Sequence, residues 1–121
     1  MKADGSDIVQ LTSHAGFNGE PEYSPDGMKI AFESDRGVGF PLEGIYVMNT
    51  SDGSNMHRVT FPSSGEVDVI PHFAPDGTRI AFTRSRGCEF KGNGRFRFPQ
   101  GCLAAVFVVD VDGSHLKRIT P

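Results

Sequence analysis

A nine-residue motif that occurs twice constrains the fold of this chain more than any other feature. Segment 24–32 reads SPDGMKIAF and segment 74–82 reads APDGTRIAF, so six of the nine positions are identical at a spacing of 50 residues. A fixed period of about 20 to 50 residues is typical of repeat architectures, in which each repeat is one supersecondary unit. The chain has 121 residues, which is enough for two such repeats and a short remainder.

Two further motifs follow the same order along the chain. The triplet Asp-Gly-Ser occurs at 4–6, 52–54 and 112–114, and each time a short run ending in Thr follows it. Segment 45–49 returns in similar form as segment 106–110, 61 residues later. Because this spacing exceeds 50, the second repeat carries an insertion of about eleven residues.

The repeat predicts four strands per copy, separated by tight turns. In Pro-Asp-Gly the proline fixes φ at the second turn position and the glycine adopts the positive φ that follows. The 15 Gly and 8 Pro are spread so evenly that the longest stretch without either is 102–112, which excludes a long helix. We expect strands at 21–24, 28–34, 44–50, 56–61, 69–74, 78–84, 104–111 and 116–120, with segment 7–12 as the fourth strand of an earlier copy.

Apolar residues lie on both faces of the predicted strands. Ile30 and Phe32 fall on one face and Ala31 on the other, and segment 106–109 is apolar at every position. An antiparallel sheet with one solvent-exposed face alternates between apolar and polar residues, so these sheets are predicted to be covered on both sides. Small four-stranded sheets stacked around a ring meet this condition. The predicted fold class is therefore all-β, with antiparallel blades of a β-propeller.

The same residues resemble a known family. The pattern YSPDGxxIAFxSxR at 23–36, followed by segment 45–49 and by DGSxxxRVT at 52–60, is similar to the repeat of TolB-like β-propellers, which are relatives of the WD-repeat propellers. The resemblance implies radially arranged four-stranded blades in a bacterial, periplasmic protein that binds other proteins without catalysis. Similar repeats also form the non-catalytic propellers of some serine peptidases. In a family of pectin-fragment lyases, the propeller itself is the enzyme.

The expected organisation is a single partial propeller domain over 1–121. Residues 1–12 would be the outer strand of a preceding blade, 13–61 the first blade, and 62–121 the second blade with its insertion at 85–103. A closed ring needs about four to eight blades, and two blades alone would expose wide apolar faces. We therefore expect a homo-oligomer, with a trimer favoured and a dimer as the alternative, unless the chain is an excised fragment.

The insertion alternates basic and aromatic residues. The residues in question are Phe90, Lys91, Arg95, Phe96, Arg97 and Phe98. Alternate residues of a hairpin point to opposite sides, so Arg95 and Arg97 would share one face. One interpretation is a recognition loop for an acidic partner; the other is that the phenylalanines pack on the blade while the arginines are only solvated. Binding residues concentrate on loops carried by a rigid scaffold, so we predict that partners bind at this rim.

Cys88 and Cys102 flank the insertion and are the only cysteines in the chain. A disulfide between them would close the insertion into a loop and would indicate an oxidising compartment. The alternative is two unpaired thiols in a reducing cytosol. A metal site is disfavoured, because there is no Cys-x-x-Cys pair and no histidine nearby.

Three polar residues are candidates for the central channel of the propeller. The resemblance places the first strand of each blade along the channel, which would bring Glu20, Glu22 and His72 to face it. A bound cation or a catalytic role for His72 is one interpretation. A structural role is the other, because no second histidine lies in register with His72.

The chain carries no sequence motif that requires catalysis. It has no Gly-x-Ser-x-Gly, no phosphate-binding loop and no His-Glu-x-x-His, and no cofactor is predicted. The net charge of −3 removes the usual electrostatic reason to expect nucleic acid as a partner, and no apolar run is long enough to span a bilayer.

The favoured function is a non-catalytic module that binds a protein partner through its loop-rich rim. The alternatives are a metal-dependent, carbohydrate-active propeller similar to the oligosaccharide lyases, and an inactive propeller fragment. The resemblance implies a periplasmic or otherwise extracytoplasmic location. The sequence as given shows no signal peptide, so a cytoplasmic location is the alternative.

Overall fold

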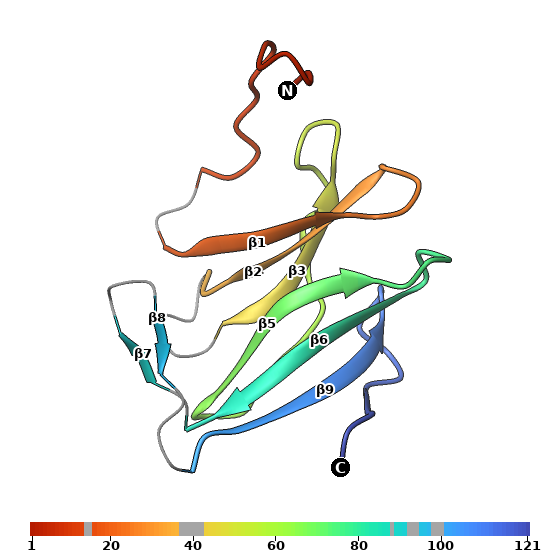
Figure 1. Ribbon diagram of the computed structural model, residues 1–121. Coiled ribbons are helices and arrows are strands. Elements are labelled where there is room, and N and C mark those ends of the chain that lie inside the picture. Colours follow the sequence, from red (N-terminus) through yellow and green to blue (C-terminus); the bar gives the residue numbers. More distant parts are fainter. Residues whose placement is uncertain (14–15, 37–42, 88, 92–94, 98–100) are drawn as a thin grey trace.

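Two four-stranded antiparallel sheets stand side by side in the computed structural model (Figure 1). The structure describes residues 1–13, 16–36, 43–87, 89–91, 95–97 and 101–121. No helix occurs in these ranges, so the predicted all-β class is confirmed. The strands are β1 (Asn18–Tyr23), β2 (Lys29–Ser34), β3 (Gly44–Asn49), β4 (His57–Arg58), β5 (Glu66–Phe73), β6 (Arg79–Arg86), β7 (Glu89–Lys91), β8 (Arg95–Arg97), β9 (Leu103–Asp110) and β10 (Lys117–Arg118).

Each sheet is one repeat of the sequence. The strand order is β1-β2-β3-β4 in the first sheet, blade one, and β5-β6-β9-β10 in the second, blade two. The first strand of each blade begins earlier than predicted, because pairing continues past a bulge. The register shifts between Gly19 and Glu22 and again between Val69 and His72, where Glu20 and Ile70 adopt φ of 46° and 56°.

The fourth strands are shorter than predicted, at two residues each. Beyond these two strands, a threonine side chain accepts the N–H of the third strand, which a backbone carbonyl would accept in a longer ladder. The Ile45 N–H donates to Thr60 Oγ1 at 2.9 Å, and the Val106 N–H donates to Thr120 Oγ1 at 2.9 Å. The threonine that ends each run in the sequence is therefore a hydrogen-bond acceptor for the third strand.

The apolar core lies between the two blades. Blade one contributes Ala31, Ile45, Val47 and Val59, and blade two contributes Ile80, Phe82 and Val109. Ile30, Phe32, Tyr46 and Met48 form a second buried cluster on the opposite face of blade one. The prediction that blade one is covered on both faces is thus confirmed, and Ala31 is the smallest residue in the cluster between the blades.

Segment 4–12 repeats the geometry of a fourth strand without forming one. The Ser6 N–H donates to Asp4 Oδ1 at 2.9 Å, as the N–H groups of Ser54 and Ser114 do to Asp52 and Asp112. Residues 8–12 then run along the outer face of blade one, where Leu11 packs on the second cluster. The segment has no strand partner among the described residues, and its relation to a preceding blade stays a prediction.

Candidate functional site

The loops predicted to carry function lie at one end of both sheets. We call this end the loop-bearing rim: it comprises 34–36, 43–44, 59–68, 84–87, 89–91, 95–97 and 101–104. In Figure 1 it is the end that carries the β7–β8 hairpin, and the short turns between β1 and β2 and between β5 and β6 lie at the opposite end. The rim therefore gathers segments that are far apart in the sequence.

The insertion forms a hairpin of its own. β7 and β8 pair antiparallel, with Phe90 opposite Phe96 and Lys91 opposite Arg95. Of the predicted partner-binding residues, Phe90, Lys91, Arg95, Phe96 and Arg97 lie in these two strands. Phe98 and Cys88 lie outside the described residues, and the binding role of the whole set stays a prediction.

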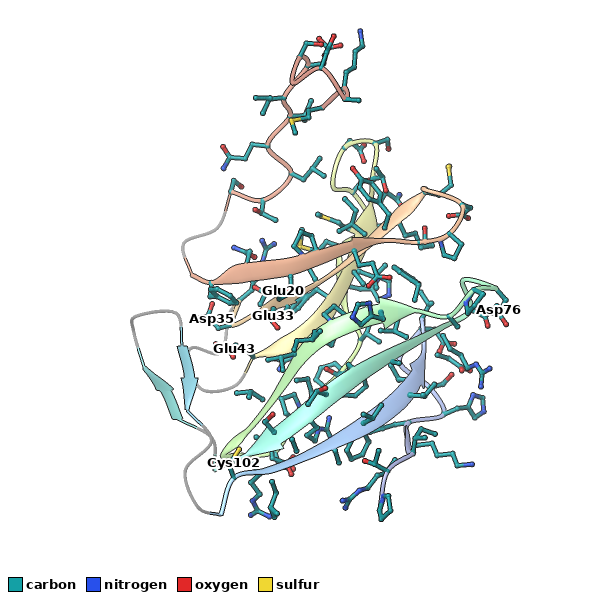
Figure 2. All side chains as sticks on the ribbon, viewed as in Figure 1. Glu20, Glu33, Asp35, Glu43, Asp76 and Cys102 are labelled. Atoms are coloured by element: carbon teal, nitrogen blue, oxygen red, sulfur yellow. The ribbon has the colours of Figure 1, made fainter. Side chains whose placement is uncertain are left out.

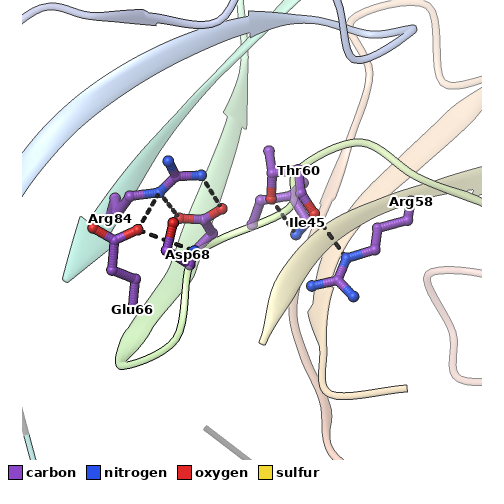
Figure 3. Close-up of polar contacts among 7 residues, drawn as sticks. Ile45, Arg58, Thr60, Glu66, Asp68 and Arg84 are labelled. Carbon is purple, nitrogen blue, oxygen red and sulfur yellow. Dashed lines mark hydrogen bonds and ion pairs between the residues drawn. The ribbon is translucent and has the colours of Figure 1, made fainter. Parts of the chain in front are cut away.

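A buried ion pair anchors the rim of blade two. Arg84 Nε and Nη2 donate to the two carboxylate oxygens of Asp68 at 2.6 and 2.8 Å, and Asp68 is 0% exposed (Figure 3). The guanidinium also lies over the Phe107 ring, 5.0 Å from its centroid, and 3.9 Å from Glu66 Oε2. The hydrogen bond to Asp68 raises the pKa of Arg84, so the charge is fixed. This bidentate geometry holds β5 against β6 directly below the insertion.

Asp68 also joins the two blades. Its backbone N–H donates to the Glu43 carbonyl at 3.0 Å, which links β5 to the start of β3. A matching polar contact holds the first blade: Arg58 Nε donates to the Thr60 carbonyl at 2.8 Å, next to the Thr60–Ile45 bond (Figure 3). The rim is thus a rigid scaffold beneath the loops.

The rim of blade one is acidic. Glu20, Glu33, Asp35 and Glu43 gather there, at the end of the sheet opposite Asp76 (Figure 2). Glu33 is 4% exposed, and its Oε2 accepts the Ile70 N–H at 3.1 Å across the blade junction. Burial raises the pKa of Glu33 to about 7, and the charges of Glu43 and Glu20 add to this effect. Burial likewise raises the pKa of Glu43.

The rim of blade two has the opposite character. A groove of about 270 Å³ lies there between the ends of β6 and β9 and the C-terminal segment. Arg84, Arg86 and Arg118 line it together with Glu66, Leu103 and Phe107. In the sequence, the insertion that follows β6 contains Lys91, Arg95 and Arg97. The groove therefore holds three arginines and one glutamate, and one of the arginines, Arg84, is already paired with Asp68.

The structure brings two of the three channel candidates together. His72 Nδ1 of blade two contacts Glu22 Oε2 of blade one, whereas Glu20 lies on the bulge and is exposed. Within the described ranges, no group of three or more His, Cys, Asp or Glu side chains could hold a metal ion. His72 and Glu22 thus contact each other across the blade junction, and their functional role stays a prediction.

Sequence reasoning missed Glu33, Glu43 and the Asp68–Arg84 pair. The available signal was positional: Glu33 follows Ile-Ala-Phe in a strand that is buried on both faces, where a charged residue is rare unless it is paired. The partner of Glu33 is the N–H of a bulge residue. Strand patterning alone does not predict such a bulge.

Comparisons with known proteins agree with this geometry. A family model described as the TolB beta propeller domain matches residues 1–96. The chain belongs to this family. Its fold is similar to that of a protein assigned as TolB from Agrobacterium tumefaciens, with a TM-score of 0.71 and 30% identity over 98% of this chain. It is also similar to TolB from Acinetobacter baumannii, with a TM-score of 0.64 and 26% identity over 95% of this chain.

The TolB-like chain spans only part of these solved structures. It corresponds to 38% of the Agrobacterium protein and 24% of the Acinetobacter protein. A search of curated proteins found no match. No helix that could cross a membrane occurs in the part of the chain that the structure describes.

Proposed function

We propose that this TolB-like propeller segment is a non-catalytic module that binds a protein partner through the loop-bearing rim of blade two. The proposal is supported by the groove of about 270 Å³ beside the β7–β8 hairpin, where Arg86 and Arg118 lie with Glu66 while Arg84 is held by Asp68. Arginine guanidinium groups on a rigid scaffold favour carboxylates, so the partner would present an acidic segment. The proposal requires no cofactor.

Charge reversal in the insertion tests this proposal. We expect Arg95→Glu to weaken capture of the partner about tenfold and to reduce the salt dependence of binding, because a favourable charge contact becomes repulsive. The matched control is Arg79→Glu, which makes the same charge change on an exposed residue beside the Asp76 turn, at the opposite end of the sheet. Partners come from a crosslinking screen, and their affinities are measured by titration calorimetry. Equal affinity of Arg95→Glu and wild type would contradict the proposal.

The location of the protein is part of the same proposal. We place it outside the cytoplasm, where Cys88 and Cys102 would form a disulfide that closes the insertion. Peptide mapping without reductant is expected to recover these two cysteines in one linked fragment. A reductant should then increase proteolysis within 89–101 and leave cleavage elsewhere unchanged. Recovery of two alkylated thiols from protein made in an oxidising compartment would contradict this pairing.

The carbohydrate-active alternative has a separate test. Metal analysis of the purified protein would reveal a stoichiometric ion that is lost in His72→Ala, if that function were present. The contact of His72 with Glu22 supports a structural role instead. Assembly into a homo-oligomer also stays a proposal.

A further inference from the structure

The carboxylates at the rim of blade one have no counter-charge among the described side chains. We call them the junction cluster: Glu20, Glu33, Asp35 and Glu43, which Figure 2 shows together at one end of the sheet. Among the side chains that the structure describes, the lysines, arginines and histidines form ion pairs with other acids and not with this cluster. The junction cluster is therefore a place where a positive charge from outside would be stabilised.

Glu43 is the buried member of the cluster that has no partner. It is 5% exposed, and its carboxylate accepts no hydrogen bond from any described residue. Asp35 is the charged neighbour that adds to the effect of burial in raising the pKa of Glu43. A buried carboxylate without a hydrogen bond or a counter-charge is costly, so a proton or a cationic ligand has to complete it.

Glu33 lies deepest in the cluster, between the two blades. Its Oε2 accepts the Ile70 N–H at 3.1 Å across the junction, whereas its Oε1 accepts no hydrogen bond within the described residues. The Glu43 backbone carbonyl accepts the Asp68 N–H at 3.0 Å, which also joins the blades. Contacts with blade two thus hold both acids in place, and their remaining oxygens are left for a ligand.

An aromatic ring lies beside these carboxylates. A Cβ added at Gly19 would lie 2.5 Å from Phe17 Cζ and 3.4 Å from Glu33 Oε1, so the ring and the carboxylate meet at this glycine. The Phe17 N–H donates to Asp35 Oδ1 at 2.8 Å, and Phe17 is 42% exposed. A ring beside carboxylates is suited to an organic cation. In the described ranges no three acidic or imidazole groups are arranged to hold a metal ion, which fits the same conclusion.

From these contacts we propose that Phe17, Glu33, Asp35 and Glu43 form a binding site for an arginine side chain of a protein partner. A guanidinium group is planar, so it can stack on a ring while it donates hydrogen bonds to carboxylates. We assign the arginine to a partner because β7 and β8 contact each other and no other strand of the described structure. The site is separate from the groove on blade two, and the inference goes beyond the proposed function.

NMR titration with the capped tripeptide acetyl-Gly-Arg-Gly-amide tests the site. We expect saturable shifts centred on the backbone amides of Phe17 and Ile70. The matched peptide with citrulline in place of arginine has the same shape without the charge, and it should bind at least tenfold more weakly. Phe17→Leu, which removes the ring and keeps an apolar side chain, should weaken binding of the arginine peptide about threefold.

A pair of protein variants shows which carboxylate is used. Glu43→Gln has the shape of the protonated acid, so it should stay folded and bind the arginine peptide about tenfold more weakly. The control is Asp76→Asn at the opposite end of the sheet, which should bind like wild type. Because Glu43 lies outside the groove on blade two, Glu43→Gln should bind an acidic partner unchanged, so this inference and the proposed function can fail separately.

Three results would overturn the inference. The first is equal affinity for the arginine and citrulline peptides, or no saturable shift with either of them. The second is an unchanged affinity of Glu43→Gln for the arginine peptide. The third is binding that occurs only after Lys91, Arg95 and Arg97 are replaced by glutamine, since the insertion of the same chain would then fill the site.

Discussion

Replacing Asp68 with alanine is expected to lower the free energy of unfolding by about 3 to 5 kcal/mol. Asp68 is fully buried and receives both hydrogen bonds of the Arg84 guanidinium, so the substitution leaves a partly buried positive charge without its main partner. A domain of ordinary stability has about 5 to 15 kcal/mol in total, so this variant should unfold at a much lower urea concentration. Equilibrium urea unfolding at fixed protein concentration measures the change.

Two further variants separate the ion pair from the loss of a side chain. Asp26→Ala removes an exposed turn aspartate that accepts bonds from Ser24 and Met28, and should cost only about 1 kcal/mol. In Asp68→Leu combined with Arg84→Met, both charges are replaced by apolar groups, so much of the loss should be recovered. If Asp68→Ala were no more costly than Asp26→Ala, the pair would not anchor the rim.

Stability is expected to fall as the pH rises from 4.5 to about 8, because of Glu33. Burial raises the pKa of this carboxyl from 4.5 to about 7, so the folded chain retains a proton that the unfolded chain releases over this interval. The stabilisation that comes from the proton retained on Glu33 is fully present below pH 4.5 and is lost as the pH rises through 7. Allowing for screening by solvent at the rim, its size is about 2 kcal/mol.

Glu33→Gln should reduce this slope and be more stable than wild type at pH 8, because glutamine stays neutral, while the part of the slope that comes from Glu43 remains. The control is Asp76→Asn at the opposite end of the sheet. Hydrogen bonds from Thr78 lower the pKa of Asp76 below its usual 3.8, so it is ionised in both states throughout this interval and the slope should persist. Thermal unfolding at several pH values measures both variants, and an unchanged slope in Glu33→Gln would disprove the assignment.

The fold was largely predictable because the same strand and turn motifs occur twice in the sequence, once in each repeat. The Pro-Asp-Gly and Asp-Gly-Ser turns, the strand patterns and the two-sided burial of β2 follow from short-range rules that act within about ten residues. The insertion was also recognisable, since it breaks the spacing of 50. The extent of the fourth strands was not predictable, because a threonine hydroxyl competes with a backbone carbonyl for the same N–H.

The site was less predictable, because its polar contacts cross between blades. Glu33 meets the N–H of Ile70, which lies 37 positions further along the chain, and only the bulge at Ile70 turns that N–H toward it. The pairing of His72 with Glu22 joins two inner strands in the same way. Such pairs depend on the angle between two sheets, which no local pattern encodes.

The sequence by itself determined that this protein is built from two propeller repeats with a loop-rich insertion. Periodic turns and apolar positions are local properties, because they depend on residues that are close together in the sequence. The tertiary structure alone decided where segment 4–12 lies, which carboxylates are buried, and which face of each blade is open. These depend on how two sheets stack, since burial, and therefore charge and accessibility, is set by neighbours distant in the chain.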